Sequence, residues 1–207
     1  MIEKKLTENK DFKWFVHLPF LSEEQCDDLI EKIKGEDSWL AGGVYDPQKE
    51  KSTSVNPSHH RECDELYLLS KTNKDIKNDY SWLIDKLNTI VKISNDRVWK
   101  FDIEGGGSDF RTIQYNTGMH FDWHSGTDAG VLSLNKLTCL IQLSDPKDFD
   151  GGDLYLAFTN EDKEFFKCPY KKGYLFIFPS FCNHMVTPLK SGERFIMRQT
   201  YLGEPFR

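Results

Sequence analysis

The stretch YNTGMHFDWHSG, residues 115–126, joins two strand-like segments through the turn sequence NTG. Alternate residues of a strand share a face, so the side chains of His120, Asp122 and His124 are expected on one side. Imidazole and carboxylate groups on one face are potential metal ligands. The stretch therefore predicts two consecutive strands, the second of which carries polar groups suited to a metal.

Similar strand-like segments fill the chain from residue 97 onward. They are short, rich in β-branched and aromatic residues, and separated by glycine-containing or polar turns. Eight such segments after two helices predict a mainly β fold, a double-stranded β-helix (jelly roll) supported by N-terminal helices. The segments are VWKFDI (98–103), FRTIQYN (110–116), HFDWH (120–124), LTCLIQLS (137–144), DLYLAF (153–158), YLFIFP (174–179), HMVTPL (184–189) and RFIMRQTYL (194–202).

The N-terminal half predicts two helices and a long polar loop. Ser22 and Gln25 form a capping box, and Gly35 ends the first helix. An apolar stripe over 75–93 predicts the second. Residues 41–60 are rich in glycine, proline and small polar residues, and this loop, with Tyr45, is a candidate lid over a substrate.

We expect one domain over residues 1–207, with helical support at about 20–95 and a jelly-roll core at about 97–203.

Composition narrows the class of partner. The net charge of −6 argues against a uniformly basic, nucleic-acid-binding surface. No apolar run is long enough to cross a membrane, and the first residues lack the apolar region of a signal peptide. The five cysteines are scattered without a CxxC pair, which predicts free thiols in a reducing compartment. We expect a cytoplasmic protein that binds neither nucleic acid nor membrane; its oligomeric state cannot be predicted.

A second histidine, His184, begins a later strand of the same predicted barrel. Together with His124 it could hold one metal ion. Sites with two histidines and one carboxylate bind Fe(II) and leave three positions open for a cosubstrate and oxygen. On a strand the carboxylate is expected two residues after the first histidine. That position holds Gly126.

The chain resembles the iron(II)- and 2-oxoglutarate-dependent oxygenases, in particular the prolyl 4-hydroxylase-like branch. The family pattern Tyr-x-x-Gly-x-x-aromatic-x-x-His-x-Asp reads Tyr115, Gly118, Phe121, His124 and then Gly126 in place of aspartate. Three further segments match: LPFLSEEQCDDLIEKI, LSDPKDFDGGDLYL and FIFPSFCNHMVTPLKSGERF. The resemblance spans roughly residues 14 to 202.

The resemblance implies a role for four residues. His124 and His184 match the two iron ligands, and Arg194 matches the residue that pairs with the far carboxylate of 2-oxoglutarate. An arginine suits this task because its planar fork binds a carboxylate bidentately. Tyr115 matches a position that often bonds the same carboxylate. The implied cofactors are Fe(II), 2-oxoglutarate and O2, with chloride or ascorbate as optional additions.

Gly126 leaves three explanations open. Halide-transferring members of the superfamily have glycine or alanine at this position, where a chloride ion binds the iron. Alternatively, Asp122 or Asp128 replaces the missing carboxylate, and His120 with Asp122 forms a literal H-x-D. In the third explanation, a hydroxylase has lost its aspartate, naturally or by engineering, and keeps weak activity.

The expected function is therefore functionalisation of an unactivated C–H bond in an amino acid, a peptidyl proline or a small molecule. Gly126 favours halogenation, with hydroxylation as the alternative. Two readings of other kinds stay open: a non-catalytic jelly-roll binding module, and a cupin-type enzyme with a different metal and no cosubstrate. Trp123, on the strand face opposite to His124, is expected to be a core residue.

Overall fold

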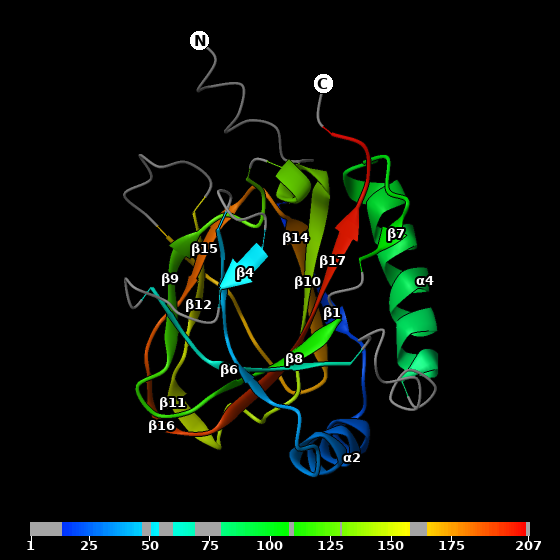
Figure 1. Ribbon diagram of the computed structural model, residues 1–207. Coiled ribbons are helices and arrows are strands. Elements are labelled where there is room, and N and C mark those ends of the chain that lie inside the picture. Colours follow the sequence, from blue (N-terminus) through cyan, green and yellow to red (C-terminus); the bar gives the residue numbers. More distant parts are fainter. Residues whose placement is uncertain are drawn as a thin grey trace.

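The computed structural model describes residues 14–46, 51–53, 60–68, 80–107, 110–128, 130–157 and 165–205. Two antiparallel sheets face each other, and two helices cover the outer face of the larger one (Figure 1). This confirms the predicted mainly β, jelly-roll architecture with flanking helices.

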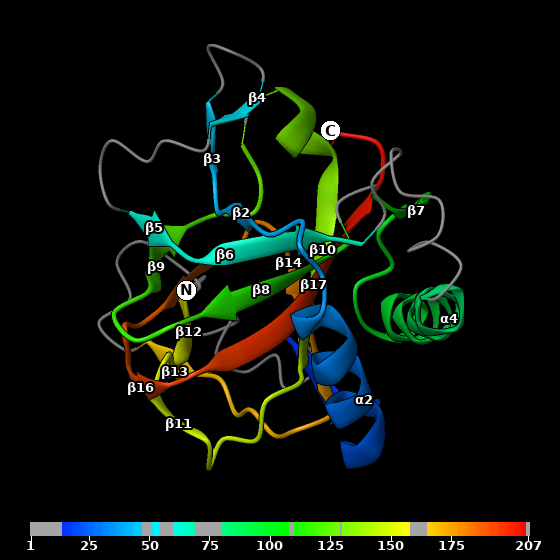
Figure 2. The same cartoon turned by 60° about the horizontal axis from the view of Figure 1, so that its bottom comes forward.

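The larger sheet carries Tyr115 and Arg194, the two residues expected to bind the cosubstrate. Its strand order is β1 (Val16–Pro19), β14 (Tyr174–Pro179), β10 (Asn135–Gln142), β17 (Arg194–Leu202), β8 (Arg111–Tyr115), β6 (Asp64–Tyr67) and β2 (Leu40–Ala41), with β7 (Gly105–Gly106) paired to β17. Figure 2 shows β6, β8 and β17 side by side.

The smaller sheet carries both candidate metal ligands. Its order is β13 (Phe166–Lys167), β12 (Leu154–Ala157), β15 (Asn183–Val186), β9 (His120–His124) and β5 (Arg61–Glu62). Two short strand pairs complete the described fold, β11 (Phe149–Gly151) with β16 (Leu189–Gly192) and β3 (Val44–Asp46) with β4 (Lys51–Thr53).

Alternation along the strands divides the core into two layers. In β17, Phe195 and Met197 pack against the helices, whereas Ile196 faces the space between the sheets. Leu29 of α2 (Glu23–Lys34) and Leu87 of α4 (Ser81–Val98) belong to the first layer. Because a strand presents opposite faces with a period of two, each central strand contributes to both layers. The inner layer surrounds the candidate site.

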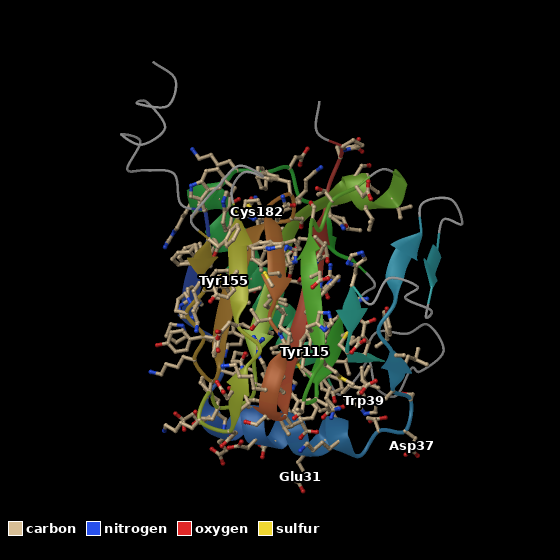
Figure 3. The ribbon with its side chains drawn as sticks, turned by 90° about the vertical axis from the view of Figure 1, so that its left-hand side faces the viewer. Glu31, Asp37, Trp39, Tyr115, Tyr155 and Cys182 are labelled. Carbon is tan, nitrogen blue, oxygen red and sulfur yellow. The ribbon has the colours of Figure 1, made fainter. Side chains whose placement is uncertain are left out.

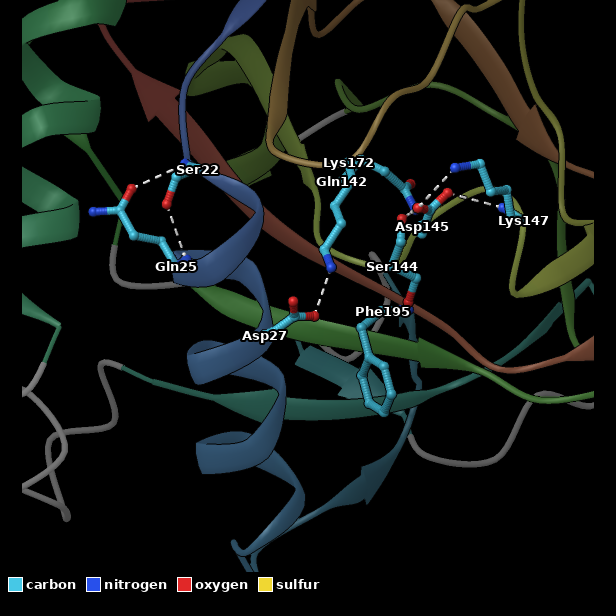
Figure 4. Close-up of polar contacts among 9 residues, drawn as sticks. All are labelled: Ser22, Gln25, Asp27, Gln142, Ser144, Asp145, Lys147, Lys172 and Phe195. Carbon is cyan, nitrogen blue, oxygen red and sulfur yellow. Dashed lines mark hydrogen bonds and ion pairs between the residues drawn. The ribbon is translucent and has the colours of Figure 1, made fainter.

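The first helix begins and ends where the sequence predicts. Ser22 accepts a hydrogen bond from the backbone N–H of Gln25, whose side chain accepts one from the backbone of Ser22 (Figure 4). This reciprocal capping box satisfies two N–H groups that the helix leaves unpaired. Lys172 of the loop before β14 bonds Asp27 of the helix at 2.6 Å, which ties the helix to the sheet.

The predicted strand VWKFDI is wrong. Helix α4 continues to Val98, beyond the expected end at residue 93, and no strand forms over residues 99–103. The Asn95 side chain donates to the carbonyl of Phe101 and accepts from its N–H, at 2.8 and 3.0 Å. The asparagine therefore replaces a strand partner, while Trp99 and Phe101 still pack on the core. The expected start of this helix lies outside the described residues.

The predicted loop over residues 41–60 is partly strand. Its described parts pair as β3 with β4, and Ala41 belongs to β2. Residues 47–50 and 54–59 lie outside the described residues. The proposed lid role of this segment stays a prediction.

All five cysteines are free, as predicted, and the structure buries each of them. In the part of the chain that the structure describes, neither helix has the length and apolar character needed to cross a membrane.

Substitution of Ser22 by alanine should lower the free energy of unfolding by about 1 kcal/mol, because the N-terminal N–H groups lose their side-chain acceptor. Urea unfolding followed by circular dichroism measures the change. Ser38→Ala, an exposed position beyond the same helix, is the matched control and should leave stability within about 0.5 kcal/mol. Equal losses in both variants would contradict the capping role.

Candidate metal centre

His124 and His184 meet between neighbouring strands. They are direct register partners in the pairing of β9 with β15. Their ring centroids lie 4.0 Å apart, with an interplanar angle of 55°. The two imidazoles, distant in sequence, therefore converge on one point of the inner face.

Backbone carbonyls orient both rings. His124 Nδ1 lies 2.7 Å from the carbonyl oxygen of Asp122, and His184 Nδ1 lies 3.0 Å from that of Cys182. A carbonyl only accepts, so each Nδ1 must carry the proton. This tautomer leaves the Nε2 lone pair of each ring available to a metal.

Both imidazoles are held in the neutral form that a metal requires. Burial lowers the pKa of His184 to about 4. Burial, and then the proximity of His184, hold the pKa of His124 well below its usual range. The two rings therefore do not repel each other at neutral pH and need not lose a proton to bind a cation.

Aromatic neighbours restrict the motion of both rings. The ring of Phe121 stacks on His124 with centroids 3.4 Å apart and an angle of 12°. The guanidinium of Arg61 lies over the ring of Phe121, 4.6 Å from its centroid. Phe178 contacts His184 edge-on at 5.0 Å. Such packing keeps the two potential ligands in place before any metal binds.

An irregularity in β9 breaks the expected alternation. His184 and Val186 are two residues apart on β15, but their partners on β9, His124 and Phe121, are three apart. The register of the two strands therefore shifts between these pairs. Such a bulge re-aims side chains. Asp122 accordingly bonds His60 at 3.1 Å and is 49% exposed, rather than joining the metal-binding pair. The expectation for Trp123 is also wrong: it is 39% exposed and lines the large cavity.

No carboxylate completes the pair within the described residues, where no group of three His, Cys, Asp or Glu side chains could hold a metal. Asp128 lines the same cavity but is not part of such a group. The two neutral imidazoles are the potential metal ligands here, and an ion held by them would need its other ligands from a cosubstrate or from small molecules.

The surroundings of Gly126 are crowded. Its N–H donates to the carbonyl of Ser180 at 2.7 Å, and its own carbonyl accepts from Asn135 at 2.6 Å. A Cβ at this position would lie 2.9 Å from the Ser180 carbonyl oxygen and 3.2 Å from the Thr138 hydroxyl oxygen. The backbone is therefore fitted to glycine, and an aspartate would require it to move.

Arg194 occupies a separate, deeper part of the interior. It is 3% exposed, and its guanidinium donates to the Gln142 side-chain oxygen at 2.9 and 3.0 Å and to the Gly152 carbonyl at 2.5 Å. The rings of Phe149 and Tyr170 lie against it at 5.7 and 5.1 Å. These partners are neutral, and the Asp153 carboxylate, which accepts from Tyr170 and pairs with Lys167, acts on Arg194 through its charge. Buried charges normally have a counter-ion, so a ligand carboxylate suits this place.

Tyr115 lies directly across from Arg194 in the pairing of β8 with β17. Its side chain is 1% exposed and points into the interior between the sheets (Figure 3). Burial raises the pKa of its hydroxyl, so it stays protonated and can donate a hydrogen bond. The structure thus brings Tyr115 and Arg194 to the same rung of the larger sheet.

Two neighbouring cavities adjoin these groups. A cavity of about 780 Å³ is lined by the two imidazoles, Tyr115 and Gly126, and a small one of about 20 Å³ lies beside Arg194. Leu140, Leu154 and Ile196 line both cavities, so these three apolar side chains lie between them.

Several groups of the site are absent from the sequence expectations. Gln142 and the Gly152 carbonyl hold Arg194, and Arg61, Arg111 and Arg198 line the large cavity. Arg198 could have been found, because it is four residues after Arg194 and so shares its strand face. Gln142 is a polar residue within an apolar strand segment, which is a weaker signal. No sequence signal of this kind marks Arg61 or Arg111.

Comparison with a protein family agrees with this geometry. Residues 110–201 match the family model of the 2OG-Fe(II) oxygenase superfamily. The matched segment includes the strands of His124 and His184 as well as Arg194. The jelly-roll part of the chain is thus similar to this superfamily, whose members depend on Fe(II) and 2-oxoglutarate and use O2.

Two curated relatives are similar over part of their length. A PKHD-type hydroxylase of Sphingopyxis alaskensis is 36% identical over 89 residues, which cover 40% of this chain and 38% of that protein. A PKHD-type hydroxylase of a Synechococcus species is 30% identical over 81 residues, covering 39% and 36%. The chain therefore matches less than two fifths of the length of each relative.

Solved structures share the whole fold at low identity. A prolyl hydroxylase from Trichoplax adhaerens, in complex with a hypoxia-inducible factor peptide, gives a TM-score of 0.71 at 17% identity and covers 98% of this chain and 87% of that one. A prolyl 4-hydroxylase from Pseudomonas putida gives 0.64 at 16%, covering 92% and 93%.

Removal of either converging imidazole should abolish tight binding of Fe(II). Anaerobic calorimetric titration of His184→Ala or His124→Ala should show affinity reduced more than about 100-fold, because even groups that only support metal ligands contribute about 10–100-fold. His120→Ala, on the same strand and in contact with Asp122, is the control and should bind as the unaltered protein does. Loss of binding in His120→Ala alone would instead assign the metal to the literal H-x-D.

Substitution of Gly126 by aspartate should not rebuild a three-ligand site. The new Cβ would collide with the Ser180 carbonyl, so both Gly126→Ala and Gly126→Asp should lose about 1–3 kcal/mol of stability. Gly35→Ala, where a Cβ has only ordinary contact at 3.4 Å, is the control for a glycine-to-alanine change. Tenfold tighter Fe(II) binding by Gly126→Asp without a loss of stability would show that this position readily accepts a ligand.

Proposed function

We propose that this chain is an Fe(II)- and 2-oxoglutarate-dependent hydroxylase that oxidises a C–H bond of an amino acid, a peptidyl proline or another small substrate. The single observation that carries the proposal is the placement of two neutral, preoriented imidazoles and a buried arginine beside two neighbouring cavities that share three lining residues. A potential metal site near a potential carboxylate site fits a chelating keto acid.

In this proposal Arg194 binds the far carboxylate of 2-oxoglutarate. Gln142 and Gly152 accept hydrogen bonds from the guanidinium and hold it in place. Tyr115, on the facing strand, donates a hydrogen bond to the same carboxylate. Leu140, Leu154 and Ile196 enclose the methylene part of the cosubstrate and exclude water.

His124 and His184 would hold the iron through Nε2. The bound metal, with 2-oxoglutarate and O2, supplies the oxidising power for hydroxylation, and the cosubstrate is converted to succinate and carbon dioxide. The protein contributes orientation: the Asp122 and Cys182 carbonyls keep each ring in one tautomer. No side chain of this set needs to change its protonation state when the metal binds.

Hydroxylation is better supported than halide transfer. The curated relatives are both named hydroxylases. The atom nearest to a Cβ at position 126 is the Ser180 carbonyl oxygen, an acceptor that repels anions, and the Thr138 hydroxyl lies next to it. Halogenation, which the sequence favoured, is therefore not part of the proposed function and is only one outcome of the product assay.

The cavity of about 780 Å³ admits an amino acid or a short peptide segment. The prolyl hydroxylase from Trichoplax adhaerens binds a peptide, which makes a peptide one of the substrates to test here. We retain the cytoplasm as the proposed location, because five free buried cysteines suit a reducing compartment.

Arg194→Gln should raise the concentration of 2-oxoglutarate needed for half-maximal succinate formation by about tenfold or more, since a charge-assisted hydrogen bond to a carboxylate is lost. Arg97→Gln, an exposed arginine on α4, is the matched control. Unchanged dependence on 2-oxoglutarate in Arg194→Gln would exclude this arginine as the anchor.

Mass analysis of products formed with and without chloride tests the reaction itself. Gain of one oxygen atom in both conditions supports the hydroxylase. Gain of a chlorine atom would instead identify the protein as a halogenase. If the protein binds neither Fe(II) nor 2-oxoglutarate in anaerobic titrations, it is the non-catalytic binding module.

A further inference from the structure

The side chain of Gln142 is the closest side-chain partner of the Arg194 guanidinium. Gln142 ends β10 and is 4% exposed, and its Oε1 atom accepts from Nε and Nη2 of Arg194 at 3.0 and 2.9 Å. Buried arginines are normally paired with a carboxylate, and glutamate has nearly the same shape as glutamine. This chain instead places a neutral amide against both nitrogens.

The orientation of the Gln142 amide is fixed from its other side. Its Nε2 atom donates to the carbonyl of Ser144 at 2.8 Å, and because a carbonyl only accepts, the amide oxygen must face Arg194. Ser144 is held in turn, since its Oγ accepts from the backbone N–H of Phe195 at 2.8 Å (Figure 4). Phe195 follows Arg194 in β17, so these contacts close a ring that begins and ends on one strand.

These contacts leave part of the guanidinium for a ligand. An arginine has five N–H groups, of which Gln142 accepts from two and the Gly152 carbonyl from a third. One N–H on each terminal nitrogen has no partner among the described residues. Two such groups can bond both oxygens of one carboxylate. Arg194 and Gln142 both line the small cavity, where a ligand would meet them together.

The nearest acidic group is Asp153, and its oxygens bond other side chains. One accepts from the Tyr170 hydroxyl at 2.5 Å and the other pairs with Lys167 at 2.7 Å. The charge of Asp153 acts on Arg194, but Lys167 balances it. The acceptors that bond the guanidinium itself are the neutral oxygens of Gln142 and Gly152.

We propose that Gln142 is a positioning residue that makes the Arg194 site selective for a ligand with a carboxylate at its far end. It orients the guanidinium as a glutamate would, but leaves the positive charge for the ligand. A glutamate at this position would instead form an internal ion pair with Arg194 and compete with the ligand carboxylate. The inference rests on the proposed function, because it concerns the far carboxylate of 2-oxoglutarate.

The preference for an acid over neutral analogues measures this role. Anaerobic calorimetric titration of the full chain with Fe(II) would use three probes: 2-oxoglutarate, its far-end methyl ester, and 2-oxopentanoate, in which a methyl group replaces the far carboxylate. We expect the unaltered protein to bind the acid at least about tenfold more tightly than either analogue, since only the acid forms charge-assisted hydrogen bonds with Arg194. In Gln142→Glu this affinity ratio should be at least about tenfold smaller.

Two further variants separate charge from orientation and from burial of a carboxylate. Gln142→Met removes the acceptor without adding charge, so it should keep the acid preference but bind 2-oxoglutarate about fivefold more weakly. Gln199→Glu is the matched control, because Gln199 is also buried in the larger sheet and also donates to a backbone carbonyl, that of Gly107 at 2.8 Å. It should keep the ratio of the unaltered protein. Thermal unfolding is recorded for every variant.

A role of Gln142 in packing alone would weaken the acid and its neutral analogues alike and leave the ratio unchanged. An unchanged ratio in Gln142→Glu, no acid preference in the unaltered protein, or unchanged affinity for 2-oxoglutarate in folded Gln142→Met would therefore overturn the proposal. If Gln142→Glu does not fold, the Met variant decides.

Succinate formation by the same samples in air tests the proposed function separately. Succinate formation with an unchanged ratio in Gln142→Glu would retain the hydroxylase and refute the role of Gln142. The expected fall of the ratio, without succinate formation by the unaltered protein, would retain a carboxylate site set by Gln142 and refute the hydroxylase.

Discussion

The antiparallel pairing of β9 with β15 is the contact on which the site depends. It places His184 opposite His124, and beside the register shift Phe121 stacks on the His124 ring and Asp122 contacts His60. Both rings then use Nδ1 for a backbone carbonyl, so their free nitrogens can meet a common ion. A regular strand would have placed Asp122 on the same face as His124, and the site would have had a different ligand set.

The larger sheet supplies the complementary half of the site. Facing residues of β17 and β8 form three successive pairs on its inner face. These are Arg194 with Tyr115 at one end, Ile196 with Ile113 in the middle and Arg198 with Arg111 at the other end. The buried Arg194 is held only by neutral acceptors of the described chain. Its charge is costly without a ligand, and binding of an anionic cosubstrate would remove that cost. The buried charge of Arg194 that suits a ligand therefore lowers the stability of the protein when no ligand is bound.

Much of this arrangement could be predicted from sequence, and the failures have identifiable causes. Short apolar runs bounded by turns, such as Tyr174–Pro179, have the predicted bounds. VWKFDI has strand composition but lies after a helix, where the Asn95 side chain satisfies the backbone of Phe101. Trp123 and Asp122 were misplaced because a bulge cannot be read from alternation. Arg61 and Arg111 were missed because no local pattern marks a cavity-facing arginine.

The sequence by itself determined the jelly-roll class and the capping box at Ser22, because periodicity and capping patterns are local properties. Its resemblance to a known family marked the two histidines and Arg194 as candidates. Only the tertiary structure decided what surrounds Gly126, which imidazole nitrogen is free and that Arg198 faces Arg111. Those facts depend on pairings between segments far apart in the chain, and a shift of one residue in register would reverse the face of every side chain involved.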